Sequence, residues 1–142
     1  MAHPQLELGD AELEVLSILW DRGQATVREV LGVLNGRGKS LAYTTVLTFL
    51  TRLEQKGYAT SNKNGLAYVY MAKVSRSKVA RARLRSVMQQ LFDGAPGAMV
   101  LQLMETERFT PEELAQFRHL IDELDTDPGG HRARRRGRGA GS

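Results

Sequence analysis

The chain has 142 residues, of which 42% are hydrophobic, and it carries a net charge of +4 and no cysteine. This length suits one domain with an appendage, and the lack of cysteine excludes disulfides, thiolate metal sites and thiol nucleophiles. No apolar run approaches the ~20 residues of a membrane helix. The first residues also lack the charged-then-apolar layout of a signal peptide, so we expect a cytoplasmic protein with no membrane insertion.

The positive charge is concentrated in the middle and at the end of the sequence. Residues 24–85 carry twelve Lys or Arg against two Glu, whereas residues 86–130 carry two Arg against nine acidic residues. Residues 131–142 add five Arg. A basic stretch of this kind is typical of a nucleic-acid-binding surface. The acidic stretch that follows it indicates a different role for the C-terminal region.

A first helix is predicted over residues 10–21, where Leu13, Leu16 and Trp20 recur at spacings of three and four. Further apolar residues widen this face, so we expect the helix to be well buried. Gly23 supplies the stop, because glycine readily adopts the left-handed geometry found at helix C-termini.

A second helix follows a short bridge or stub of strand at residues 24–26. Thr26 and Glu29 have capping-box spacing, in which each side chain bonds the backbone N–H of the other residue. The apolar stripe of this helix has the spacing i, i+3, i+4 and i+7: Val27, Val30, Leu31 and Leu34. A flexible basic turn at residues 36–39 then leads into the next helix.

A third helix is predicted between Ser40 as N-cap and a stop at Lys56-Gly57. Its buried stripe consists of Val46, Leu50 and Leu53. Two helices joined by a short turn form a helix-turn-helix, in which the second member reads DNA.

Four threonines on this third helix need an explanation, because threonine costs up to ~0.7 kcal/mol per site relative to alanine. They are Thr44, Thr45, Thr48 and Thr51. One interpretation is that they are tolerated surface residues. The other is that short hydroxyl side chains keep the helix slim enough for a major groove, where they bond phosphates or base edges. Arg52 would then add a charged phosphate contact.

After the third helix the periodicity changes to two, which predicts a β-hairpin. Residues 58–63 and 66–72 are the expected strands, joined by a turn at Asn64-Gly65. A lone hairpin is marginal in water, so it must pack against the helices. Three helices followed by a hairpin make a winged helix, and the predicted fold class is mainly α with a small β wing. Lys63 lies at the hairpin tip, within reach of a phosphate.

Helical periodicity returns in the C-terminal region. Residues 77–92 and 98–104 are predicted helices, and Thr110, Pro111 and Glu113 make an unusually complete start for a last one. The apolar faces of these helices exceed what one chain can hide, which favours a homodimer over folding back onto the same winged helix. The predicted dimerisation residues are Leu84, Val87, Met88, Leu91, Val100, Leu101, Leu114, Phe117, Leu120, Ile121 and Leu124.

The predicted domain organisation has three parts. Residues 1–74 form a winged-helix DNA-binding domain, residues 75–124 a helical dimerisation domain, and residues 125–142 a disordered basic tail. The tail is interpreted either as an arm that adds non-specific DNA affinity or as a solvated appendage.

No catalytic or metal site is predicted. His3, His119 and His131 are scattered over the leader, the last predicted helix and the tail. No base with an oriented partner is evident, and no spacing of His and carboxylates suggests metal ligation. We therefore expect no enzymatic activity, no metal and no cofactor.

Four fragments in order resemble the penicillinase repressor family, the BlaI/MecI group of winged-helix transcriptional regulators. They are residues 11–16 (AELEVL), 25–30 (ATVREV), 43–46 (YTTV) and 67–70 (AYVY). Leu19-Trp20, Thr48, Leu50, Arg52-Leu53 and Lys56-Gly57 add to the match. The resemblance covers roughly residues 6–124 and is specific because all the fragments occur at the family's spacing.

The resemblance implies a homodimer that binds palindromic operators in double-stranded DNA and represses β-lactam-resistance or cell-wall-stress genes. It implies that Thr44 and Thr45 read bases, while Thr48 and Arg52 grip phosphates. Relatives have lysine at the position of Thr44, a departure that bears on the operator sequence. The predicted DNA-binding residues are Arg28, Lys39, Ser40, Tyr43, Thr44, Thr45, Thr48, Arg52, Lys63 and Tyr68.

The resemblance also suggests a membrane sensor protease as a partner. Relatives inactivated by proteolysis are cut at an Asn-Phe pair in the short apolar helix, and the aligned pair here is Gln102-Leu103, the candidate proteolysis site. The copper-responsive branch of the family senses metal with a Cys-rich C-terminus, which this chain lacks. A different class of function also fits the fold, namely a winged-helix protein-interaction module with only non-specific DNA affinity.

Overall fold

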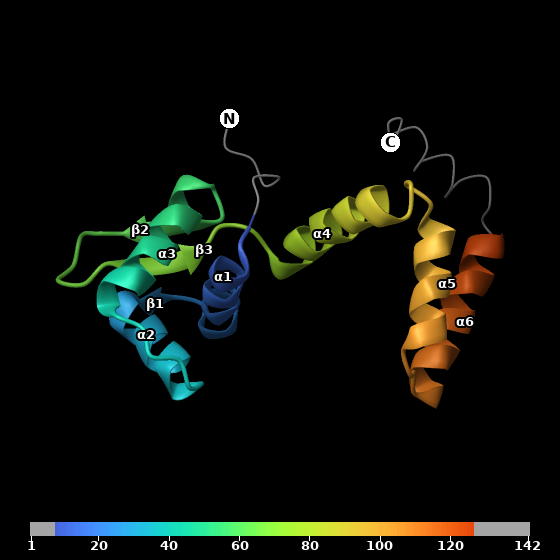
Figure 1. The fold of residues 1–142 in the computed structure, drawn as a ribbon, viewed down its shortest axis with the longest axis horizontal. Coiled ribbons are helices and arrows are strands. Elements are labelled where there is room, and N and C mark those ends of the chain that lie inside the picture. The colour runs from blue at the N-terminus through green and yellow to red at the C-terminus, as the bar shows by residue number, and fades with distance from the viewer. Residues whose placement is uncertain (1–7, 127–142) are drawn as a thin grey trace. The chain divides into compact units, whose positions relative to one another are not determined.

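The structure, a computed structural model, describes residues 8–126, and the chain divides into two compact units (Figure 1). One unit ends at Ala95 and the other begins at Pro96. The first holds α1 (Asp10–Arg22), β1 (Ala25–Thr26), α2 (Val27–Gly36), α3 (Tyr43–Gln55), β2 (Ala59–Asn62), β3 (Val69–Ala72) and α4 (Arg76–Leu91). The second holds α5 (Pro96–Thr106) and α6 (Pro111–Thr126). The predicted fold class, a mainly α winged helix-turn-helix, is confirmed.

The core of the first unit lies where α1, α2 and α3 pack together and against the sheet. The predicted stripe of α3 is completely buried, since Val46, Leu50 and Leu53 each have 0% exposure. Tyr70 of β3 is buried with them, and burial raises the pKa of its phenol. Burying each large apolar side chain stabilises the fold by roughly 1.5–3 kcal/mol. This shared core therefore fixes the position and rotation of α3.

The first helix ends, and the second begins, as predicted; α1 itself is capped by Gly9 and not by Asp10, the N-cap expected from the sequence. Thr26 Oγ1 accepts the N–H of Glu29 at 3.1 Å, and Glu29 Oε1 accepts the N–H of Thr26 at 2.8 Å, which is the predicted capping box. Gly23 terminates α1 with φ of 86°, and its N–H donates to the Leu19 carbonyl at 2.8 Å. A positive φ of this kind favours glycine.

The prediction that Ser40 caps α3 was wrong. The N-cap is Ala42, in extended conformation and without a side-chain cap bond. The cause lies in α2, where the Asn35 side chain accepts the N–H of Leu41 at 2.9 Å and donates to the Leu41 carbonyl at 3.3 Å. These two bonds hold the chain extended past Ser40, so the helix starts later.

The sheet has three antiparallel strands in the order β1-β3-β2. The expected stub at residues 24–26 is thus β1, and its Ala25 pairs with Tyr70 of β3. On the other side of β3, Asn62 of β2 pairs with Val69. The hairpin is therefore joined by residues 63–68, and the predicted tight Asn64-Gly65 connection was wrong. Asn64 instead donates its N–H to the Asn62 side chain at 2.9 Å, so the wing tip is a longer loop.

The helix α4 is joined to the first unit at its N-terminal end. Ser75 caps it by accepting the N–H of Lys78 at 3.0 Å, and Val79 is its buried residue. Arg83 donates to the carbonyl of Leu8 at 2.6 Å. Trp20 of α1 donates to the Val74 carbonyl at 2.8 Å, which fixes the segment just before α4.

In the second unit, the predicted start of the last helix is confirmed. Thr110 Oγ1 accepts the N–H of Glu113 at 3.0 Å, and Glu113 accepts the N–H of Thr110 at 2.9 Å. Phe109 packs edge-to-face on Phe117, with ring centroids 5.2 Å apart. Neither α5 nor α6 contains a buried residue. The predicted tail lies almost wholly outside the described residues.

Candidate nucleic-acid interface

One side of α3 is solvent-exposed and carries most of the predicted reading residues. Tyr43, Thr44, Thr48 and Arg52 are exposed, and Thr45 is half-buried. The opposite side is the buried stripe, so the orientation of this face follows from the hydrophobic pattern alone. The exposed face presents two threonines, an arginine and a phenol, side chains that bond phosphates or base edges.

The threonines of α3 differ in their hydrogen bonds. The Thr48 hydroxyl donates to the Thr44 carbonyl at 2.9 Å, one turn back along the helix. The Thr48 hydroxyl has one hydrogen, so it must give up this bond before it can donate to a phosphate. Thr51 is half-buried and hydrogen-bonds the Tyr70 phenol, which lowers the raised pKa of that group. Thr51 therefore has a structural role in the core and does not belong to the exposed face.

Two of the predicted aromatic residues each lie beneath a cation. The Arg28 guanidinium of α2 stands 5.2 Å from the ring centre of Tyr43, and Lys63 Nζ stands 5.6 Å from that of Tyr68. Both rings are exposed, at 41% and 46%. Exposed cation–π pairs are worth about 0.5–1 kcal/mol. These pairs place the Arg28 side chain at the N-terminal end of α3 and the Lys63 side chain over the Tyr68 ring within the wing.

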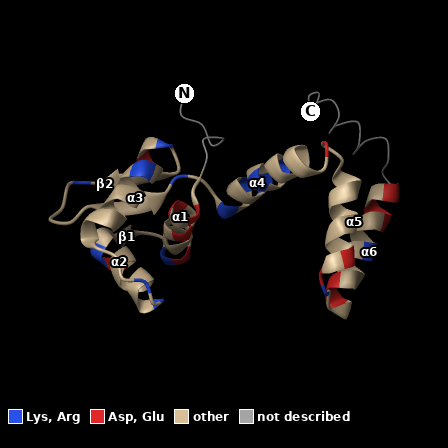
Figure 2. Cartoon of the chain, viewed as in Figure 1, with Lys and Arg blue, Asp and Glu red and all other residues tan. Residues whose placement is uncertain are grey.

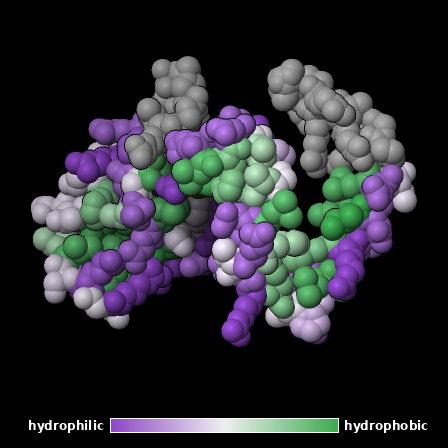
Figure 3. Space-filling model, turned by 45° about the vertical axis from the view of Figure 1, so that its right-hand side comes forward, coloured by the Kyte–Doolittle hydropathy of each residue, from purple (hydrophilic) through white to green (hydrophobic). Residues whose placement is uncertain are grey.

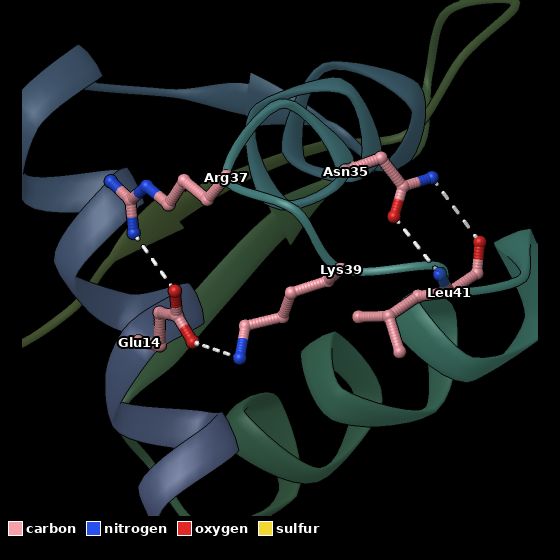
Figure 4. A network of polar contacts seen from close by, with 5 residues as sticks. All are labelled: Glu14, Asn35, Arg37, Lys39 and Leu41. Atoms are coloured by element: carbon pink, nitrogen blue, oxygen red, sulfur yellow. Dashed lines mark hydrogen bonds and ion pairs between the residues drawn. The ribbon is translucent and has the colours of Figure 1, made fainter.

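The turn between α2 and α3 is held by a carboxylate of α1 (Figure 4). Glu14 Oε2 lies 3.0 Å from Arg37 Nη1, and Glu14 Oε1 lies 3.4 Å from Lys39 Nζ. The hydrogen bond from Arg37, stronger than the opposing effect of burial, holds the pKa of Glu14 below its usual value, and Lys39 lowers it further. Sequence reasoning identified Lys39 but missed Glu14, Asn35 and Arg37, because these contacts span 6 to 25 residues.

The wing has a comparable arrangement. Glu54 of α3 lies 3.7 Å from Lys63 Nζ and accepts a 2.7 Å hydrogen bond from Ser61 of β2. Arg52, by contrast, forms no ion pair with any residue from 8 to 126. The structure thus brings Arg28, Tyr43, Thr44, Thr48 and Arg52 onto α3 or its N-terminal end, with Lys39 on the preceding turn and Lys63 and Tyr68 on the wing. Ser40 is exposed in the turn.

Residues 8–123 match the penicillinase repressor family. The chain belongs to the penicillinase repressor family. The family is one of DNA-binding transcriptional repressors.

The matches to two curated relatives cover nearly the whole length of each relative. The penicillinase repressor of Bacillus licheniformis is 26% identical over 117 residues, which cover 82% of this chain and 91% of the relative. The methicillin resistance regulatory protein MecI of Staphylococcus aureus (strain N315) is 23% identical over 122 residues, covering 86% and 98%. The solution structure of the DNA-binding domain of the repressor BlaI is 32% identical and covers 54% of this chain and 92% of that domain, with a TM-score of 0.46.

Charge in this family member is segregated along the described chain (Figure 2). Lys and Arg colour α4 and the ends of α2, whereas Asp and Glu colour α1 and α6. Lys and Arg are thus concentrated in the first unit, as the sequence predicted. His119 is a surface residue of α6. Its Nε2 lies 3.0 Å from Glu123 Oε2, and its side chain is 76% exposed.

Apolar side chains remain exposed on the helices predicted to dimerise. Figure 3 shows hydrophobic residues gathered over the α5–α6 unit. Leu91 is 73% exposed, Leu101 62%, and Leu84 and Leu120 55% each. Ile121, Val87 and Val100 are also exposed, while Met88, Leu114, Phe117 and Leu124 are half-buried. A soluble monomer rarely leaves so many large apolar residues in water.

The candidate proteolysis site lies within α5. The Gln102 and Leu103 carbonyls both accept from the Thr106 hydroxyl, at 2.9 and 3.5 Å. A protease requires an extended chain, so cleavage here would need local unwinding of this helix. Cleavage at this pair stays a prediction.

Across residues 8–126, no three His, Asp or Glu are grouped so as to hold a metal ion. Over the same residues, every helix is too short or too polar to span a membrane.

Proposed function

We propose that this protein is a homodimeric repressor that places one α3 from each chain in the major groove of a palindromic operator. The observation that carries the proposal is the exposed side of α3, where Thr44, Thr48 and Arg52 face solvent directly opposite the buried stripe. Recognition helices of dimeric helix-turn-helix proteins lie about 34 Å apart, one turn of DNA.

The residues have separate roles in this proposal. Thr44 and Thr45 contact base edges, and a threonine methyl also packs against the methyl of thymine. Thr48 and Arg52 bind phosphates, as do Lys39, Ser40 and Arg28 near the start of α3. Lys63 and Tyr68 carry the wing to the DNA backbone. Phosphate contacts set affinity and salt dependence, whereas base contacts set sequence preference.

Dimerisation is supported by the exposed apolar faces of α4, α5 and α6. No residue of α5 or α6 is buried within the described chain, although Leu101, Leu120 and Ile121 are large and apolar. A two-fold dimer buries the same patch on both subunits at once. Two linked reading helices then match the symmetry of a palindrome.

The regulated genes are proposed from the relatives. Those relatives are called penicillinase repressor and methicillin resistance regulatory protein. We place this chain's targets among β-lactam-resistance or cell-wall-stress genes, with repression by occupation of the promoter.

Footprinting of the purified protein across genomic DNA tests the proposal, and a gel shift on a recovered palindrome completes it. Deleting residues 125–142 is the control, since five of the arginines of the chain lie there. A repressor retains its preference for the palindrome over random DNA after the deletion. A truncated protein that binds no duplex would instead indicate a protein-interaction module.

A further inference from the structure

Two of the cations expected to contact DNA, Lys39 on the turn before α3 and Lys63 on the wing, are held by carboxylates of the same unit. On the α2–α3 turn, Glu14 binds Arg37 at 3.0 Å and Lys39 at 3.4 Å (Figure 4). On the wing, Glu54 lies 3.7 Å from Lys63. Arg52, on the exposed face between them, has no such carboxylate among residues 8–126.

We propose that Glu14 and Glu54 are built-in competitors of DNA phosphate, which occupy the flanking cations in the free protein and lower its affinity for every duplex. This inference rests on the proposed function, because it concerns the same DNA-binding surface. It assigns to two acidic residues the task of limiting non-specific binding.

Each carboxylate is engaged by two neighbouring side chains. Glu14 uses one oxygen for Arg37 and the other for Lys39, and its side chain is 29% exposed. Glu54 is 31% exposed and is anchored by the 2.7 Å hydrogen bond from Ser61. Glu14 is ionised near neutral pH, as an ordinary glutamate is, and the Arg37 hydrogen bond lowers its pKa further.

The energetic consequence follows from the polyelectrolyte character of DNA. A cation that neutralises a phosphate releases a counterion and contributes about 0.9 to the slope of log K against log salt. A cation already paired with a carboxylate brings little net charge, and the carboxylate itself repels the phosphate. Because phosphate contacts carry no sequence information, the effect should be the same on random and operator DNA.

The test replaces each carboxylate by the isosteric amide, in Glu14→Gln and Glu54→Gln, within the full chain. Binding to a fluorescein-labelled random-sequence duplex is measured by anisotropy over a series of KCl concentrations. Each variant is expected to bind up to about fivefold more tightly, the upper range for an exposed ion pair, with a salt slope steeper by up to about 0.9. Glu107→Gln removes the same charge from an exposed site in the second unit and should change neither quantity.

A second comparison separates the effect of the ion pair from the effect of removing a negative charge. In a chain that already carries Arg37→Gln and Lys39→Gln, the further change Glu14→Gln should bring a smaller gain than in the wild type, because only the repulsion of phosphate by the carboxylate remains to be removed. Circular dichroism confirms folding, and the two sites are independent, so either one carries the test if the other variant unfolds.

Unchanged or weaker binding by folded Glu14→Gln and Glu54→Gln would overturn the inference, since it would mean that the carboxylates position the cations for DNA. That result leaves the proposed function intact. A wild-type chain that binds no duplex would overturn the proposed function, and this inference with it.

Discussion

At the scale of single residues, Glu12 is the only buried charged side chain among residues 8–126. It accepts a 2.7 Å hydrogen bond from Lys56 and a 3.1 Å bond from the N–H of Gly9. Burial by itself raises the pKa of Glu12, but these bonds and the positive charges of Lys56 and Arg52 bring it below its usual value. The pair joins the start of α1 to the end of α3, so it helps to hold α3 in place.

Glu12→Gln tests the contribution of this ion pair. Since the pKa of Glu12 is lower in the folded state, ionised Glu12 stabilises the fold above its unfolded-state pKa, and this contribution disappears as pH falls through the folded-state value. The variant should lose about 1–3 kcal/mol of unfolding free energy near neutral pH and much less in acid, at a pH below the lowered folded-state pKa. Urea unfolding at both pH values measures this, with exposed Glu105→Gln as control; an equal loss in acid would contradict it.

In the proposed function, Arg52 sets affinity and Thr45 sets sequence preference. Arg52→Ala should weaken binding to all duplexes and reduce the salt slope by about one, because a phosphate contact is lost. Thr45→Ala should mainly relax preference, by about 1–3 kcal/mol at the base that it reads. Titrations of operator and random duplexes over a salt series measure both effects. Equal losses on both duplexes for both variants would argue against these roles.

At the scale of elements, the start of α2 depends on one hydroxyl. Thr26 both caps α2 and lies in β1, so the helix and the sheet meet at this residue. Thr26→Ala removes the cap and should lower the unfolding free energy by about 1 kcal/mol. Thr26→Ser keeps the hydroxyl and should recover most of the loss. Thermal unfolding of the two variants decides this, and equal melting temperatures would show that the cap contributes nothing.

At the scale of the whole molecule, the second unit depends on a partner in our proposal. Leu120→Glu places a charge on an apolar site that is 55% exposed, and burying that charge against a second copy would be costly. Sedimentation should therefore show a dimer for the wild type and a monomer for the variant, with DNA affinity reduced. Leu66→Glu, at the fully exposed wing tip, should remain dimeric. A dimer that survives Leu120→Glu would exclude that part of α6 from the interface.

Much of this molecule was predictable from local pattern. The apolar spacing of Val46, Leu50 and Leu53 determined which side of α3 is buried, because a 3.6-residue period has only one orientation toward a core. The capping boxes at Thr26 and Thr110 were equally predictable, since their partners lie three residues away. The family resemblance rested on the same short fragments.

The tertiary structure decided what depends on distant partners. Asn35 delays the start of α3 by bonding Leu41, and Thr51 turns out to bond Tyr70 of the sheet. Glu14 meets Lys39 only because α1 packs beside the α2–α3 turn. No periodicity records such pairings, because they are created when the shared hydrophobic core brings separate helices together. The sequence alone therefore determined the helices and which side of α3 is exposed. Packing decided which polar groups of α3 stay free of bonds within the protein.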